Sequence, residues 1–302
     1  MRSILTGGAI VALSCAMLAF TQLPPLPPLP TPTPPPTLPT PPPLPGPITV
    51  TLTISGNEAQ GSFEFEGIGI GADFTIAFEN AVGLVPTALD VTVALVNPVD
   101  PLLLGRLPGP GVGIPVAFPV LIRISPSSTS ALSFSGPYTI SIHTHNLALD
   151  PNLPLSLFKA PEGAAFKDIT KWEGRGSYRD DGGGGDFSEF MIAVDLRQID
   201  GVIVGKFDDL QATLDNYATS MPPTVLAELQ EDLSEARTLY QSGEIRRAIV
   251  KMRVFSRDVK RHSGEEIPDV WRAGCAPLVN VAGLLRSGAD TLRFSLDRKP
   301  SH

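Results

Sequence analysis

The sequence has little cysteine, tryptophan and charge. Of 302 residues, two are Cys, two are Trp and 18% are charged, whereas an average chain has about 25% charged residues. Motifs of the serine hydrolase elbow, the zinc metalloprotease helix, the P-loop and the dinucleotide-binding loop are absent. The net charge of −8 disfavours nucleic acid as a partner, because its binders need a basic surface. We therefore expect a protein that is not an enzyme, and we assign no catalytic or cofactor-binding residue.

Proline and apolar residues are plentiful instead. The chain holds 32 Pro, and 42% of its residues are hydrophobic, which is more than disordered chains contain. The chain is long enough for about two domains. These proportions predict a folded core combined with an extended, proline-rich part.

Residues 1–21 predict a signal peptide. Met1-Arg2 supplies a positive charge, and residues 4–20 contain no charge at all, as in secretory signals. Cleavage is expected before Gln22. Two alternatives stay open: an uncleaved signal anchor, and lipidation at Cys15. All three place the chain outside the cytoplasm, in the periplasm or secreted at the cell envelope of a bacterium, with membrane contact only through an uncleaved or lipidated N-terminus.

Residues 22–47 predict a proline-rich linker. Fifteen of the 24 residues from Pro24 to Pro47 are proline, which prevents helix and sheet and favours polyproline II. The linker would be a stalk of about 70 Å. A ligand for an SH3-type domain is the alternative.

Residues 48–206 predict an immunoglobulin-like antiparallel β-sandwich. Apolar residues alternate with polar ones in several short runs, which is typical of strands with one buried face. The runs include Ile48–Ile54, Phe74–Phe78, Val91–Leu95 and Tyr138–Ile142. Residues 166–200 predict a long hairpin whose loose turn is Asp180–Asp186, with four consecutive glycines.

Residues 207–295 predict an antiparallel helical bundle, followed by a frayed tail at 296–302. Apolar residues recur every three or four positions. Helices are expected over 208–217, over 222–241, over 244–261, from Pro268 through Trp271, and after Pro277. Cys275 is expected to be a buried, inert thiol, with an intermolecular disulfide or a reactive thiol as the alternative. The fold class is therefore α+β and multidomain, with the sandwich first and the bundle second.

The helical part resembles the FIMAH domain over about residues 207–290. The resemblance rests on a pattern of apolar and glycine positions. These are Leu229, Leu233, Ala236, Gly243, Ala248, Met252, Phe255, Val259, Gly264 and Ile267. FIMAH-type modules are small helical bundles attached to exported bacterial proteins. The resemblance implies such a bundle here and carries over no catalytic residue.

Two groups of residues are weak candidates for metal binding. His143 and His145 lie two positions apart on one predicted strand, so they share a face and suit zinc. The second group, which suits calcium through its oxygen ligands, consists of Asp180, Asp181, Asp186 and Glu189. The favoured interpretation of both is ordinary solvated side chains on a strand and at a hairpin tip. We therefore predict no cofactor, with zinc or calcium as the alternative.

One predicted helix has a basic face that suits anionic lipid or polysaccharide. It consists of Arg246, Arg247, Lys251, Arg253, Arg257, Lys260 and Arg261. The preceding helix carries Glu228, Glu231, Asp232 and Glu235, so the favoured interpretation is a solvated face whose charges are partly offset by ion pairs with that helix.

These observations predict an exported structural or adhesive protein that binds another protein or the envelope. Its contact surface would be the polar faces or the open edges of the sandwich. The alternative is an accessory module that binds a glycan, such as an envelope polysaccharide, or calcium at the cell surface.

Overall fold

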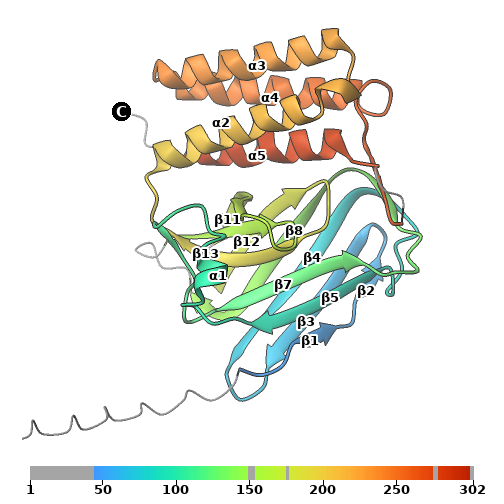
Figure 1. Cartoon of the computed structure of the whole chain (residues 1–302), viewed down its shortest axis with the longest axis vertical. Helices are drawn as coiled ribbons and strands as arrows, with labels where there is room; N and C mark the ends of the chain where they lie inside the picture. The colour runs from blue at the N-terminus through green and yellow to red at the C-terminus, as the bar shows by residue number, and fades with distance from the viewer. Residues whose placement is uncertain (1–43, 149–153, 175–176, 275–277, 300–302) are drawn as a thin grey trace, which may run out of the picture. The chain divides into compact units, whose positions relative to one another are not determined.

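The computed structural model describes residues 44–148, 154–174, 177–274 and 278–299. Figure 1 shows a β part built from two sheets and a layer of helices. The predicted signal peptide, most of the predicted linker, Cys275 and Pro277 lie outside the described residues.

Sheet A contains seven antiparallel strands. Its edges are β1 and β10, and β6 pairs with β13 beside the main path. In spatial order the path is β1 (Ile48–Val50), β5 (Leu89–Leu95), β7 (Val120–Pro126), β13 (Glu189–Asp195), β9 (Leu155–Ala160) and β10 (Lys167–Asp168), with β6 at Val112–Gly113.

Sheet B also contains seven antiparallel strands. Its longest member, β8 (Ser133–Ala148), pairs with β4 along most of its length and with two further strands on its other side. In spatial order the path is β11 (Thr170–Gly174), β12 (Ser177–Gly184), β8, β4 (Ile70–Val82), β3 (Glu58–Phe65) and β2 (Thr53–Ser55), with β14 (Val270–Arg272) beside β8.

The main core lies between the two sheets. Alternation turns Phe74 and Ile76 of β4, Ile140 of β8, and Val91 and Val93 of β5 into it, and all are almost fully buried. A smaller core covers the other face of sheet A, where Leu103 of the short helix α1 (Pro101–Leu104) belongs to the same apolar cluster as Phe158 and Met191. The central strands of sheet A are therefore buried on both faces.

Four long helices form a core of their own. It includes Phe207, Leu229, Met252, Phe255 and Leu292, whose side chains are fully buried. The helices are α2 (Ile199–Asn216), α3 (Pro223–Gln241), α4 (Ile245–His262) and α5 (Val281–Arg298), with a short 3-10 turn at Ala218–Ser220. None of the helices in the described ranges is long and apolar enough to cross a bilayer.

The four-glycine run is a docking surface for α5, so the prediction of a loose turn is wrong. Gly182–Gly184 belong to strand β12, and Gly185 follows it. A Cβ at Gly183 would lie 2.7 Å from Ser287 Oγ of α5, and one at Gly185 would lie 2.8 Å from the Asn280 carbonyl oxygen. Glycine here allows the backbone of a helix to approach a sheet closely.

Three helix predictions also need correction. The segment expected to be helical around Trp271 is strand β14, whose Trp271 pairs with Phe134 of β8 and stacks on its ring. The first helix begins at Ile199, not Asp208, and the last one extends to Arg298, into the expected tail. The helices expected at 222–241 and 244–261 are confirmed.

The predicted fold class, a multidomain chain with an immunoglobulin-like sandwich, is wrong. An immunoglobulin sandwich has seven to nine strands in all, whereas each of these sheets has seven. Strand β14 comes from the predicted helical domain yet pairs with sheet B, and the described residues belong to one compact unit. The order of strands first and helices second is as expected, but the two parts share hydrogen bonds and a contact surface.

Candidate functional site: the outer face of sheet B

The outer face of sheet B, which points away from sheet A, is polar. Side chains alternate between the two faces along β8. Ile140 and Ile142 point inward, so Ser141 and His143 point outward. On β12, Arg179 and Asp181 point outward in the same way, because they alternate with the buried residues Tyr178 and Asp180. An antiparallel sheet with one solvated face shows this alternation.

Strand register places the outward side chains in rows across the sheet. One row runs from Arg179 of β12 through His143 of β8 to Asp73 of β4. Neighbouring strands lie about 4.8 Å apart, and directly opposed side chains on one face contact each other or a shared ligand.

A second row crosses four strands beside the first. It consists of Trp172, Asp181, Ser141 and Thr75. At about 4.8 Å per strand the row spans about 14 Å. The two rows thus set polar groups and one indole within reach of a single extended ligand.

These rows line an open hollow of about 670 Å³, a size typical of ligand sites. We call it the sheet B hollow. It is lined by Glu58, Asp73, Phe74, Thr75, Ala77, Ser141, His143, Lys171, Trp172, Arg179 and Asp181.

Trp172 is the exposed aromatic residue of the hollow, with 46% of its surface accessible. A Cβ at Gly174 would lie 2.6 Å from the indole and 3.3 Å from the Cβ of Arg179. The ring therefore rests over Gly174, in space that only glycine leaves free. This seat fixes the indole while leaving part of it open to the hollow.

A Gly174→Ala variant should displace the indole, because the added methyl would overlap it. We expect the fluorescence of Trp172 to shift and unfolding free energy to fall by about 1–2 kcal/mol. The measurement is emission in a Trp271→Phe background, where Trp172 is the single remaining tryptophan of the two. Gly113→Ala is the control, since nothing lies within 4 Å of a Cβ there. An unchanged emission spectrum would contradict the packing of the Trp172 indole over Gly174.

Lys171 reaches the hollow because of a β-bulge. The register between β11 and β12 shifts between Thr170 and Trp172, so Lys171 is the extra residue, and bulges re-aim side chains in this way. The Lys171 side chain passes over β12 beside its glycines, and the ammonium donates a hydrogen bond to Thr139 Oγ1 on β8. Burial lowers the pKa of Lys171, although Asp290 and Asp181 act to raise it.

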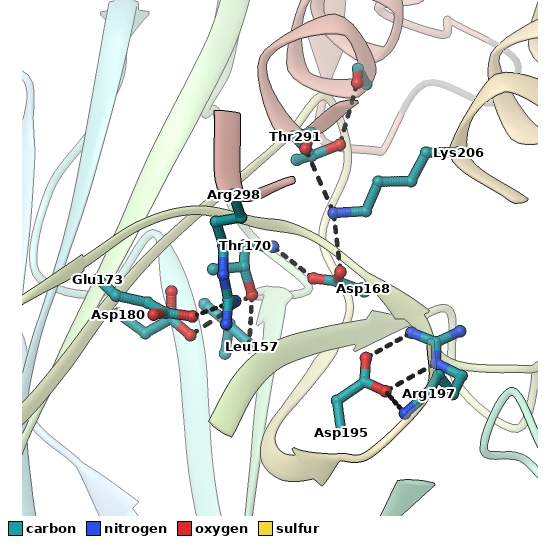
Figure 2. Close-up of polar contacts among 11 residues, drawn as sticks. Leu157, Asp168, Thr170, Glu173, Asp180, Asp195, Arg197, Lys206, Thr291 and Arg298 are labelled. Atoms are coloured by element: carbon teal, nitrogen blue, oxygen red, sulfur yellow. Dashed lines mark hydrogen bonds and ion pairs between the residues drawn. The ribbon is translucent and has the colours of Figure 1, made fainter. Parts of the chain in front are cut away.

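A second polar cluster joins the helices to the sheets, as Figure 2 shows. Lys206 of α2 lies 2.7 Å from Asp168 of β10, with both side chains under 10% exposed, and also donates to the Thr291 carbonyl oxygen of α5 at 3.3 Å. Arg298 of α5 lies 2.8 Å from Glu173 of β11. These groups bind one another, so we interpret the cluster as the contact that holds the helices on the β part.

Asp180, a weak calcium candidate, is a buried carboxyl group close to this cluster (Figure 2). Tyr178 donates its hydroxyl to Asp180 Oδ2 at 2.6 Å, while Asp180 Oδ1 has no hydrogen-bond partner. Burial raises the pKa of Asp180 well above its ordinary value, despite the Tyr178 hydrogen bond. The carboxyl group is fully buried, so it is not open to a calcium ion from solvent.

The other three calcium candidates point to different places. Asp181 lines the sheet B hollow, Asp186 forms an ion pair with Lys159, and Glu189 lies between Arg106 and Arg123. The structure therefore does not bring the four predicted carboxylates together.

The two zinc candidates do share a face of β8. His145 lies 3.1 Å from Glu64 and 3.3 Å from Asp73; burial lowers the pKa of His145, but the two carboxylates raise it above its ordinary value overall. His143 opens into the hollow. Within the described ranges no group of three or more His, Cys, Asp and Glu residues is suited to hold a metal ion.

Two of the seven residues on the basic face of α4 form ion pairs with α3, in line with the favoured interpretation. Lys251 lies 2.8 Å from Asp232 and 2.6 Å from Glu235, and Arg261 lies 2.5 Å from Glu228. Lys260 pairs instead with Glu79 of β4, and Arg246 forms no ion pair in the described ranges, so the helical layer uses only part of the charge on this face.

Only part of the hollow could be found from the sequence. The site residues predicted there include His143 and Asp181 but not Lys171, Trp172 or Arg179. The local sequence held no signal for this strand, because the buried positions after Tyr178 are Asp180 and glycines and no apolar residues alternate there.

Comparison with known proteins gives one match. Residues 42–299 match a family described as Family of unknown function (DUF6689). No curated protein matches the chain, and no solved structure does either. The resemblance of the helical part to FIMAH modules stays a prediction.

Proposed function

The chain belongs to this family of unknown function, and we propose from its own residues that it is an exported, non-enzymatic module that binds a polysaccharide of the cell envelope. The sheet B hollow is the proposed binding surface. The observation that carries the proposal is Trp172, whose half-exposed indole rests over Gly174 at a polar hollow. Export rests on the predicted signal peptide.

The chemistry of the hollow suits sugars. An indole offers a large, rigid apolar face beside polar groups, and a sugar ring has an apolar C–H face ringed by hydroxyl groups. Asp181 lies directly opposite Trp172, and Ser141 follows on the next strand. Their oxygen atoms can accept or donate hydrogen bonds to those hydroxyls.

The shape of the hollow favours a chain over a small molecule. It is open along the sheet, and its rows of polar residues continue across three or four strands. An extended polymer could therefore contact several rows at once, with many weak contacts adding up to useful affinity.

The test is affinity electrophoresis of the folded chain in gels that contain neutral or acidic polysaccharides. Trp172→Ala should lower the affinity for the retarding polymer at least tenfold, about 1.4 kcal/mol, because it removes the stacking face. Trp172→Phe should keep most of the binding. The melting temperature should change little, because Trp172 is exposed.

The control is Val82→Ala, which trims an apolar side chain that is 74% exposed outside the hollow. It should bind like the unaltered protein. The proposal fails if no polysaccharide retards the folded protein, or if Trp172→Ala binds as tightly as Val82→Ala.

A further inference from the structure

Within the described residues, neither cation of the sheet B hollow forms an ion pair, although Asp181 and Asp290 act on Lys171 electrostatically. Within the part of the chain that the structure describes, the Arg179 guanidinium forms no hydrogen bond or ion pair, and the Lys171 ammonium bonds only to the Thr139 hydroxyl. A guanidinium has five N–H donors and an ammonium has three. The hollow therefore holds unused cationic donors on two neighbouring strands.

Several other charges on this face are paired. Glu79 of β4 accepts from Arg286 at 2.5 Å and from Lys260 at 3.2 Å, which fastens α5 and α4 to the sheet. Asp73 is bound by His145. In contrast, Arg179 and Lys171 form no ion pair in the described part of the chain, so their charges are open to an added anion.

The opposite side of the hollow is acidic. Glu58 of β3 and Asp73 of β4 line it there, whereas Lys171, Trp172 and Arg179 come from β11 and β12. Asp181 lies across from Trp172, where it is suited to accept from a sugar hydroxyl. An anion would be attracted to the β11–β12 side and repelled from the β3–β4 side.

We propose that the hollow selects an acidic polysaccharide in which charged and neutral sugars alternate, with Arg179 and Lys171 binding a carboxylate and Trp172 stacking on the sugar ring. This inference rests on the proposed function and adds the charge and spacing of the ligand to it. A guanidinium matches a carboxylate through two parallel hydrogen bonds. A polymer with a carboxylate on every sugar would set more charges near Asp73 and Glu58, which lie two and three strands from the strand of Arg179.

Lys171 adds a second consequence. Burial lowers its pKa, and a bound carboxylate would favour the charged form again. Binding of the acidic polymer should therefore protect Lys171 from acetylation by an amine reagent, whereas a neutral polymer should protect it less.

The experiment uses hyaluronate, in which uronate and neutral sugars alternate, and its carboxyl-reduced form, which has the same backbone without the charge. The unaltered protein should bind hyaluronate at least tenfold more tightly than the reduced polymer. Polygalacturonate, charged at every sugar, should bind more weakly than hyaluronate. Rising salt should weaken only the binding of the charged polymers.

Two variants separate charge from stacking. Arg179→Gln should lower the affinity for hyaluronate at least tenfold and lower the affinity for the reduced polymer by a clearly smaller factor. Trp172→Ala should weaken both. Arg246→Gln is the matched control, because Arg246 is another arginine without an ion pair in the described ranges but lies on α4, outside the hollow.

The outcomes distinguish this inference from the proposed function. The charge assignment is overturned if hyaluronate and its reduced form bind equally, or if Arg179→Gln binds hyaluronate as tightly as Arg246→Gln does. In both cases the proposed binding through Trp172 still stands. The same holds for binding of a neutral polysaccharide through Trp172 without any binding of hyaluronate. If no polysaccharide of either kind binds the folded protein, both proposals fail.

Discussion

Lys206→Met should destabilise the protein by about 3–5 kcal/mol, because it leaves the Asp168 carboxylate buried without its counter-ion. The two charged groups lie 2.7 Å apart and are under 10% exposed. The variant also loses the hydrogen bond to the Thr291 carbonyl oxygen. Urea unfolding followed by circular dichroism gives the free energy.

The neighbouring Lys167 provides a matched control. It pairs with Asp209, but the two side chains are 58% and 46% exposed, and exposed pairs contribute about 0–1 kcal/mol. The free energy of unfolding of Lys167→Met should therefore be close to that of the unaltered protein. Similar losses for the two variants would show that Asp168 is not held as a buried carboxylate.

The effect of Lys206→Met should depend on pH. Burial acts to raise the pKa of Asp168, but Lys206 and Thr170 lower it below the ordinary value of 3.8. This carboxylate therefore contributes stability that is present above about pH 4 and lost as pH falls through its folded pKa. In the variant burial dominates and raises the pKa, so the difference in stability should shrink as pH falls from 7 towards 4.

Gly185→Ala should cost about 3 kcal/mol and lower the melting temperature by about 6–12 °C. The new Cβ would lie 2.8 Å from the Asn280 carbonyl oxygen and 2.9 Å from the Leu284 amide nitrogen. Both are backbone atoms, so no side-chain rotation relieves the overlap and α5 has to move.

Hydrogen exchange should locate that change. Amides of α5 should exchange faster in Gly185→Ala, while those of β4 and β5 keep their protection. Gly113→Ala, where a Cβ meets nothing within 4 Å, should stay within about 0.5 kcal/mol of the unaltered protein. If Gly185→Ala is as stable as Gly113→Ala, the glycine run is not a docking surface for α5.

Strands with one buried face could be predicted from the sequence. Ile140 and Ile142, or Phe74 and Ile76, alternate with polar residues because one side packs in the core. Their partners could not be predicted, since β8 pairs with β4, β12 and β14, which are far apart in the chain. Alternation reports burial of a face and carries no information about the neighbouring strand, so the two seven-stranded sheets were missed.

The candidate site was harder to predict for two local reasons. Four glycines in a row favour a turn when they are considered alone, and only the packing of α5 explains why they lie in a strand. The bulge at Lys171 shifts the register of β11 by one residue, which hides that Trp172 and Asp181 share a face. Both features depend on tertiary contacts that the local pattern does not contain.

Strand β14 has a consequence for the order in which the chain can fold. Ser133 donates to the Trp271 carbonyl oxygen across 138 residues, and Asn280 donates to the Gly136 carbonyl oxygen across 144. At ordinary elongation rates these partners leave the ribosome roughly 7–28 s apart. The start of β8 thus waits through the synthesis of most of the helical layer before this edge of sheet B closes, and the slow step of folding should be the arrival of the C-terminal segment.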